Sequence, residues 1–142
     1  MSDIYEMMST LRAVRRLKVD PIPRDVLETV LQAACWAPTG GQPWRVIVVS
    51  SPDRKQALAD IYRPAWYKYA KGYDARLDAL PTAEREKGQR ARSAGDYLAD
   101  HLHEAPAILM FIADPKQMAI TDAKLDRISM VGGGSVYTAV QN

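Results

Sequence analysis

Three arginines within five residues are the side chains in this sequence best suited to bind a ligand. Arg12, Arg15 and Arg16 lie in the segment "RAVRR" at residues 12–16. A guanidinium group binds phosphate through paired hydrogen bonds, and two such groups a few residues apart can hold one phosphate. The alternative is a solvated basic turn after a first helix, because arginine is favoured near a helix C-terminus. The segment is therefore a candidate phosphate site.

A second candidate lies where an apolar helix passes into a strand, in "APTGGQPW" at residues 37–44. A Thr-Gly-Gly turn exposes backbone N–H groups and has no side-chain bulk to keep a flat or anionic ligand away. The alternative is a turn that only reverses the chain, with Trp44 filling the core behind it.

The remaining polar motifs predict less. "VGGGSV" at residues 131–136 opens a helix that could take an anion or act as a hinge. His101 and His103 diverge on a helix and have no third ligand cluster, so we expect no metal site. Cys35 lies on the apolar face of its helix and is expected to be an inert core residue. Since no nucleophile arrangement is present, any chemistry would come from a cofactor.

The elements that must position these motifs follow from apolar periodicity and turn residues. We expect helices over 3–9 (capped by Ser2), 24–36 and 52 to about 62, a helix within 94–106, and one after the glycines at 132–134; buried strands are expected over 45–50 and 107–115. The charged region 63–95 predicts one or two solvent-facing helices or a mobile excursion. Its aromatic residues could cover a pocket, although packing along a surface helix is favoured: Trp66, Tyr67, Tyr69 and Tyr73.

Composition indicates an ordinary globular protein. The chain has 142 residues, of which 47% are apolar and 25% charged, so we expect a single domain over 1–142. A net charge of +2 does not favour a nucleic-acid partner. A single cysteine, no signal-peptide pattern and no membrane-length apolar run predict a cytoplasmic protein. With two convincing strands and a last helix that has no stop signal, the chain is expected to be the front portion of a longer one.

Three segments in this order resemble the nitroreductase family of FMN-dependent oxidoreductases. The specific one is "LRAVRRLKVDPIPRDVLETVLQAACWAPTGGQPWRVIVV" at residues 11–49, followed by "HEAPAILMFIADP" and "GGGSVYTAVQN". The resemblance implies an α+β fold, a sandwich of helices around a central mixed or antiparallel sheet, here truncated at the C-terminus. It also implies a homodimer with FMN at the subunit interface.

The resemblance carries a cofactor site onto eight residues. The flavin phosphate and ribityl chain would be held by Arg12, Ala13, Val14, Arg15 and Arg16. The turn at Pro38, Thr39 and Gly40 would reach a flavin bound mainly to the other subunit. No catalytic side chain and no metal ligand is implied. The turn departs from the family pattern, because Gly41 runs directly into Gln42 and the loop is two residues shorter.

The implied activity passes electrons from NAD(P)H through bound FMN to a nitroaromatic, a quinone or a similar small acceptor. No membrane or nucleic-acid partner is expected. The alternative is a truncated family member that binds no flavin and serves as a non-enzymatic remnant or an interaction module. A phosphate-binding module that uses the arginines and the Gly-Gly-Gly turn is a third reading. Retention of flavin separates the first from the others.

Overall fold

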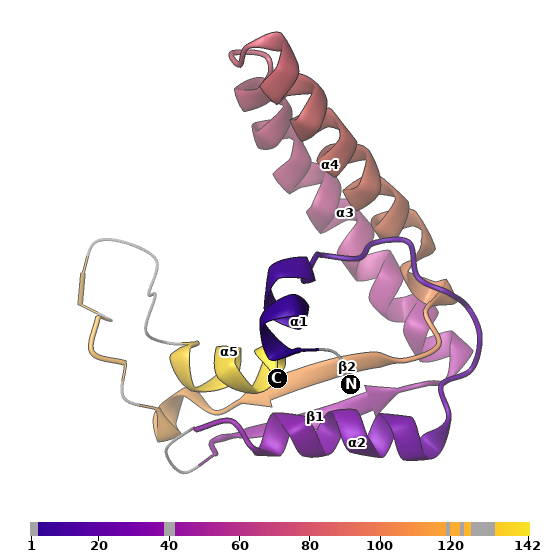
Figure 1. Cartoon of the computed structure of the whole chain (residues 1–142), viewed down its shortest axis with the longest axis vertical. Coiled ribbons are helices and arrows are strands. Elements are labelled where there is room, and N and C mark those ends of the chain that lie inside the picture. Colours follow the sequence, from indigo (N-terminus) through magenta and orange to yellow (C-terminus); the bar gives the residue numbers. More distant parts are fainter. Residues whose placement is uncertain (1–2, 39–41, 119, 123, 126–132) are drawn as a thin grey trace. The chain divides into compact units, whose positions relative to one another are not determined.

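The computed structural model describes residues 3–38, 42–118, 120–122, 124–125 and 133–142. In chain order the elements are α1 (Ile4–Thr10), α2 (Arg24–Cys35), β1 (Trp44–Val49), α3 (Pro52–Leu77), α4 (Thr82–His101), the 3₁₀ turn η1 (Leu102–Glu104), β2 (Ile108–Ala113), the 3₁₀ turn η2 (Pro115–Gln117) and α5 (Gly134–Gln141) (Figure 1). This helix-rich chain with an antiparallel sheet confirms the predicted α+β class. Two compact units form it, Met1–Val19 with Ser51–Ala105, and Asp20–Ser50 with Pro106–Asn142.

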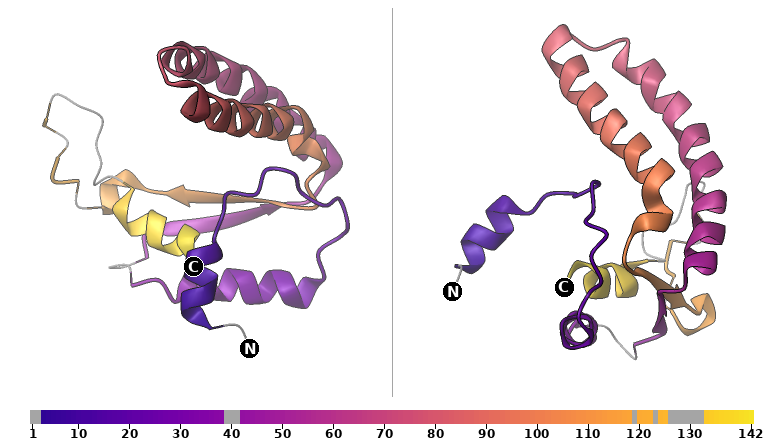
Figure 2. Two further views of the ribbon diagram at one scale, coloured as in Figure 1. Left: turned by 45° about the horizontal axis from the view of Figure 1, so that its top comes forward. Right: turned by 90° about the vertical axis from the view of Figure 1, so that its right-hand side faces the viewer.

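The first unit is built on a hairpin of α3 and α4, which lie side by side (Figure 2). Small residues make this close approach possible, and the buried ones are Ala59, Ala70, Gly88, Gly95 and Ala99. A Cβ on Gly95 would lie 2.1 Å from Cζ2 of Trp66, so the indole fills the space that a larger residue would need.

A row of aspartates joins the two helices of the hairpin. Asp96 Oδ1 accepts a hydrogen bond from Trp66 Nε1 at 2.8 Å, and Asp74 Oδ1 accepts one from Arg92 Nε at 2.9 Å. Asp100 accepts from the Tyr67 hydroxyl at 3.1 Å. That hydrogen bond, with a smaller contribution from burial, raises the pKa of Tyr67, because ionisation would remove the donor and place a phenolate beside a carboxylate.

The hairpin corrects one predicted boundary. The sequence predicts that the helix from residue 52 ends near Tyr62. Pro64 lies just beyond this point and cannot donate a hydrogen bond to the carbonyl of residue 60. Instead α3 continues through Pro64 to Leu77. Contacts across the hairpin on either side of the proline, such as Arg63 with Asp100 and Trp66 with Asp96, offset the missing bond. For residues 63–95 the sequence leaves open one or two helices or a mobile excursion, and the structure confirms helices.

The second unit is a two-stranded sheet covered by α2 and α5. β1 pairs with β2 in antiparallel register, from Trp44 opposite Ala113 to Val49 opposite Ile108. The core lies on the face that the two helices cover, and its buried members are Ala34, Ala37, Trp44 and Ala139, with Val46, Phe111, Ala113 and Val136 packed against them.

Burial in this unit is lower than the sequence predicts. Ile47 and Ile112 face away from α2 and α5, and each is 46% exposed, so the strands are not fully buried. Successive residues of a strand point to opposite faces, and the described helices of the unit cover one face only. Cys35 is exposed, not in the core, because the buried residue of α2 is its neighbour Ala34, and successive residues of a helix point about 100° apart. In the first unit, the N-cap of α1 is Asp3, where the sequence predicts Ser2. The Asp3 carboxylate accepts a hydrogen bond from the Tyr5 N–H at 3.4 Å.

A pair of glycine substitutions tests the close packing of the hairpin. Gly95→Ala should lower the free energy of unfolding by about 1–3 kcal/mol, because the new methyl displaces the Trp66 ring. Gly72→Ala is the matched control, since a Cβ there meets nothing within 4 Å. On α3 it should stabilise by up to about 1 kcal/mol. Thermal unfolding followed by circular dichroism measures both; equal effects of the two substitutions would contradict this packing.

Candidate functional site

The arginine segment follows α1 directly and forms neither helix nor strand. Arg12 Nη1 donates to the carbonyls of Ser9 at 3.0 Å and Leu11 at 2.7 Å, at the C-terminal end of α1. This is the helix-end contact that the sequence offered as the alternative to phosphate binding, and it uses one nitrogen of the guanidinium group. The other donors of Arg12 remain available to an anion.

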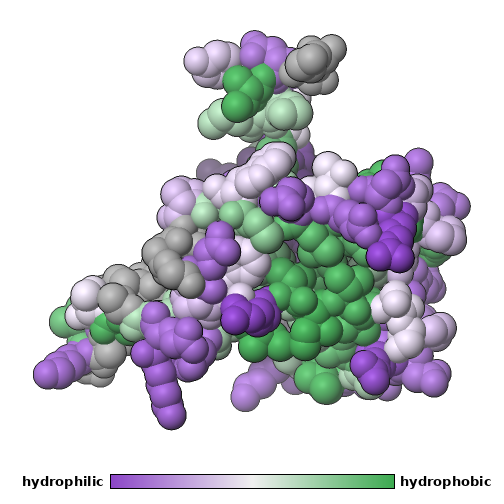
Figure 3. All heavy atoms as spheres, turned by 90° about the horizontal axis from the view of Figure 1, so that it is seen from below, coloured by the Kyte–Doolittle hydropathy of each residue, from purple (hydrophilic) through white to green (hydrophobic). Residues whose placement is uncertain are grey.

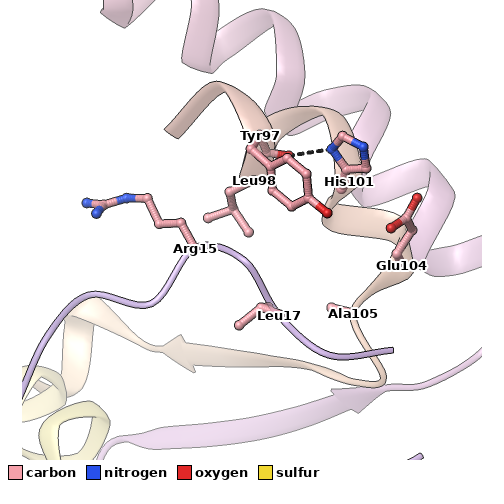
Figure 4. A pocket seen from close by; sticks show the side chains of 7 residues that line it. All are labelled: Arg15, Leu17, Tyr97, Leu98, His101, Glu104 and Ala105. Carbon is pink, nitrogen blue, oxygen red and sulfur yellow. Dashed lines mark hydrogen bonds between the residues drawn. The ribbon is translucent and has the colours of Figure 1, made fainter. Parts of the chain in front are cut away.

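Arg15 and Arg16 differ in what they touch. Arg15 Nη1 lies 3.5 Å from the carbonyl oxygen of Ala13, at the limit of a hydrogen bond. Its side chain lines a small pocket with residues of α4 and the turn after it, and in Figure 4 it extends away from Tyr97 and His101. Arg16 lies on the ring of Tyr97, with Cζ 4.0 Å from the ring centroid.

The donor set of this segment fits a phosphate. Among the described residues, no aspartate or glutamate forms an ion pair with Arg12, Arg15 or Arg16. Ala13 and Val14 between them are exposed and add no competing charge. An anion with several acceptor oxygens would therefore offset positive charge that the described chain leaves uncompensated.

The turn at Pro38, Thr39 and Gly40 is the second predicted part of the site, and the structure describes only Pro38 of these three residues. Thr39 and Gly40 lie outside the described residues, and Pro38 is exposed just after the end of α2. Pro38 belongs to the second unit and the arginine segment to the first, so each is placed within its own unit. Val131 and Gly132 of the glycine-rich motif also lie outside the described residues, while α5 begins at Gly134 as expected.

Two amide side chains close the end of α2 beside this turn. Gln42 Nε2 donates to the carbonyl of Cys35 at 3.0 Å, and Asn142 Nδ2 donates to that of Ala33 at 3.2 Å. The last carbonyls of a helix have no partner within it, and the Gln42 bond satisfies that of Cys35. The Ala33 carbonyl also accepts from the Trp36 N–H at 3.1 Å. Gln42 makes its bond with φ of 42°, a left-handed conformation that costs a non-glycine residue energy. The bond to α2 therefore holds the base of the turn.

Trp44 anchors the turn from the strand side, as the sequence predicts. It is 7% exposed and packs with Ala34 and Ala37 of the core. Its ring lies 5.8 Å from that of Phe111 on the neighbouring strand, at an angle of 48°. The described residues on either side of 39–41 thus belong to a capped helix end and to a strand that begins with a buried indole.

The aromatic residues of α3 divide between the two predicted roles. Trp66 and Tyr67 hydrogen-bond across the hairpin, as expected for helix packing. Tyr69 is exposed, and a cleft of about 170 Å³ is lined by Arg15, Trp66, Tyr69, Tyr73, Ala91 and Arg92. Arg92 is already paired with Asp74 and Asp96, so the charge that this cleft offers to a ligand is that of Arg15.

Tyr97 is a residue near the arginine segment that the sequence motifs did not indicate, and its neighbour His101 was considered only as a metal ligand. They lie four positions apart on α4, and their rings stack 4.0 Å apart. The sequence spacing alone could have indicated this stack, because aromatic side chains four positions apart face each other on a helix. Within the part of the chain that the structure describes, no group of three metal-ligating side chains is found.

The sequence from residue 10 to residue 142 matches the model of the nitroreductase family. The chain belongs to this family. It is 36% identical to iodotyrosine deiodinase 1 of Rattus norvegicus over 147 aligned residues, which cover 99% of this chain and 49% of the relative. It is 43% identical to an NADH dehydrogenase of Thermus thermophilus over 51 residues, 34% of this chain and 25% of the relative. The chain thus spans about half the length of the rat relative.

Membership places the chain among proteins of the flavin-dependent oxidoreductase kind. The match begins two residues before Arg12 and includes every residue of the predicted cofactor site. None of the helices in the described ranges is both long and apolar enough to cross a bilayer.

Substitutions at Gln42 test whether its bond to α2 holds the turn. Gln42→Ala loses the hydrogen bond and keeps the left-handed backbone, so it should destabilise by about 1–2 kcal/mol. Gln42→Gly loses the same bond but relieves the backbone cost, and should be about 1 kcal/mol more stable than Gln42→Ala. Chemical denaturation of both variants measures the difference; an alanine variant as stable as the glycine variant would show that the conformation carries no cost.

Proposed function

We propose that this chain binds FMN and serves as an oxidoreductase that takes electrons from NAD(P)H and delivers them to a small organic acceptor. The observation that carries the proposal is the arginine segment, whose guanidinium groups have no acidic partner among the described residues and lie inside the family match. When bound, FMN would supply the redox chemistry, accepting electrons from the nicotinamide and passing them on.

The chain's own residues would bind and orient the cofactor. Arg12 and Arg15 would hold the phosphate through charge-assisted hydrogen bonds, with Arg16 beside them. Ala13 and Val14, exposed and apolar, would lie along the ribityl chain. Pro38, Thr39 and Gly40 would contact the flavin ring from the other subunit of a homodimer.

The partner in this proposal is a second copy of the chain. α2 leaves apolar side chains at its surface, with Val26 47% and Val30 49% exposed. Figure 3, which shows the face that carries α2, has a continuous area of apolar side chains. Apolar areas of this kind mark protein interfaces. The single cysteine, exposed and without a disulfide, supports a reducing compartment such as the cytoplasm.

The acceptor has two candidate classes. A nitroaromatic or quinone follows from the family resemblance. An iodinated tyrosine follows from the relative named iodotyrosine deiodinase 1, which aligns with nearly the whole chain. Reductive removal of iodine replaces a C–I bond by C–H, consumes two electrons and one proton, and releases iodide. The two classes are separated by product, iodide or a reduced nitro or quinone group.

Reconstitution with FMN followed by gel filtration tests the proposal. Flavin absorbance should co-elute with a protein peak of dimer size and bleach when NAD(P)H is added without oxygen. The bleached sample should then recover colour with a nitroaromatic, a quinone or iodotyrosine, and iodide release identifies the last.

Variants that remove positive charge inside and outside the predicted site show whether the arginine segment is responsible. The double substitution Arg12→Met and Arg15→Met should abolish co-elution, because each phosphate contact contributes about 1.5–3 kcal/mol. Lys18→Met, which removes a nearby positive charge outside the predicted site, should retain the flavin. A colourless dimer of the unsubstituted chain would favour a family member without flavin, and flavin retained by the double variant would exclude the arginines as anchors.

A further inference from the structure

The ring of Tyr97 is contacted on both of its faces. Arg16 Cζ lies 4.0 Å from the ring centroid, and the His101 ring stacks on it with a centroid distance of 4.0 Å and an angle of 12°. Two planar groups at these distances cannot share one face of a phenol ring. Arg16 and His101 therefore lie on opposite faces, and Tyr97 lies between a guanidinium group and an imidazole.

His101 fixes the Tyr97 ring on α4 itself. Its Nδ1 lies 2.8 Å from the backbone carbonyl oxygen of Tyr97, as the dashed line in Figure 4 shows. A carbonyl oxygen only accepts, so Nδ1 carries the hydrogen and the imidazole is held in one orientation. The stacked pair is thus a preformed surface of α4, on which Arg16 can lie.

The arginine segment has few other attachments. Arg12 bonds to the end of α1, which has no buried residue, and residues 11–20 form no helix or strand. Arg15 and Leu17, on either side of Arg16, line the small pocket formed with Tyr97, Leu98, His101, Glu104 and Ala105. Arg15 also lines the cleft with Trp66 and Ala91. Among these approaches of the segment to the hairpin, the stack of Arg16 on Tyr97 is the specific side-chain contact.

We propose that Tyr97 is a positioning residue for the cofactor site. By stacking on Arg16 it holds the arginine segment against α4, so that Arg15 and Arg12 are presented to the phosphate while Arg16 serves as the attachment. A guanidinium group suits this role because its flat face packs on an aromatic ring without needing an acidic partner. The proposal rests on the proposed function, since the phosphate is that of FMN.

Limited trypsin digestion tests the attachment without any flavin. Tyr97→Leu removes the ring and should increase cleavage after Arg12 and Arg15 by about threefold, the loss expected for one exposed cation–π contact. Tyr97→Phe keeps the ring and should be cleaved like the unsubstituted chain. Arg16→Met leaves α4 intact, so it should raise cleavage at Arg12 and Arg15 even if Tyr97→Leu fails to fold.

Affinities for FMN and riboflavin test the role in binding. Arg16→Met and Tyr97→Leu should each weaken FMN by about threefold and leave riboflavin, which has no phosphate, unchanged. Because both substitutions break the same contact, the double variant should bind FMN no more weakly than either single variant. Additive losses would instead make Arg16 a direct phosphate ligand and overturn the proposal.

The two readouts separate the possible failures. FMN binding together with unchanged trypsin cleavage in Tyr97→Leu and Arg16→Met would overturn the attachment and leave the proposed function standing. No FMN binding by the unsubstituted chain would overturn the proposed function and the cofactor role of Tyr97, and the trypsin result would then report on the stack alone.

Discussion

Three arginines without an acidic partner among the described residues, Arg12, Arg15 and Arg16, are the feature on which the site depends. A multivalent anion attracts such a group of positive charges through charge-assisted hydrogen bonds. In the same unit, three aspartates of the hairpin pair with hairpin arginines: Asp100 with Arg63, and Asp74 and Asp96 with Arg92. Arg63 and Arg92 are thus paired within the chain. The arginines of the N-terminal segment instead contact backbone carbonyls and the Tyr97 ring and, in the proposed function, a phosphate.

The hairpin of α3 and α4 provides a rigid support for the arginine segment. Small residues bring α3 and α4 close, and the charged pairs between them fix the two helices relative to each other. α4 can then present Tyr97 and His101 as a rigid pair, since their spacing on one helix sets the stack. In the second unit the end of α2, the Gln42 bond and buried Trp44 hold the turn that the family resemblance assigns to the flavin ring.

The sequence predicted the elements whose signals are local. The apolar repeat of α2 and the β-branched run of β1 are confirmed within one residue at each end. The predicted end of α3 near Tyr62 is wrong because the packing that carries the helix through Pro64 comes from α4, which is distant in sequence. The prediction for Cys35 is wrong because helix periodicity does not show which apolar positions the fold covers; Val26 and Val30 are likewise exposed. Tyr97 was missed because its significance comes from Arg16, 81 positions away in the sequence.

The affinity of the chain for FMN relative to riboflavin tests the central claim most directly. The two flavins share the ring and the ribityl chain and differ in the phosphate, so their ratio isolates what the arginine segment contributes. Charge-assisted hydrogen bonds to Arg12 and Arg15 predict that FMN binds at least about tenfold more tightly, measured by quenching of flavin fluorescence. Equal affinities for the two flavins would contradict the account, because the phosphate would then have no partner in this chain.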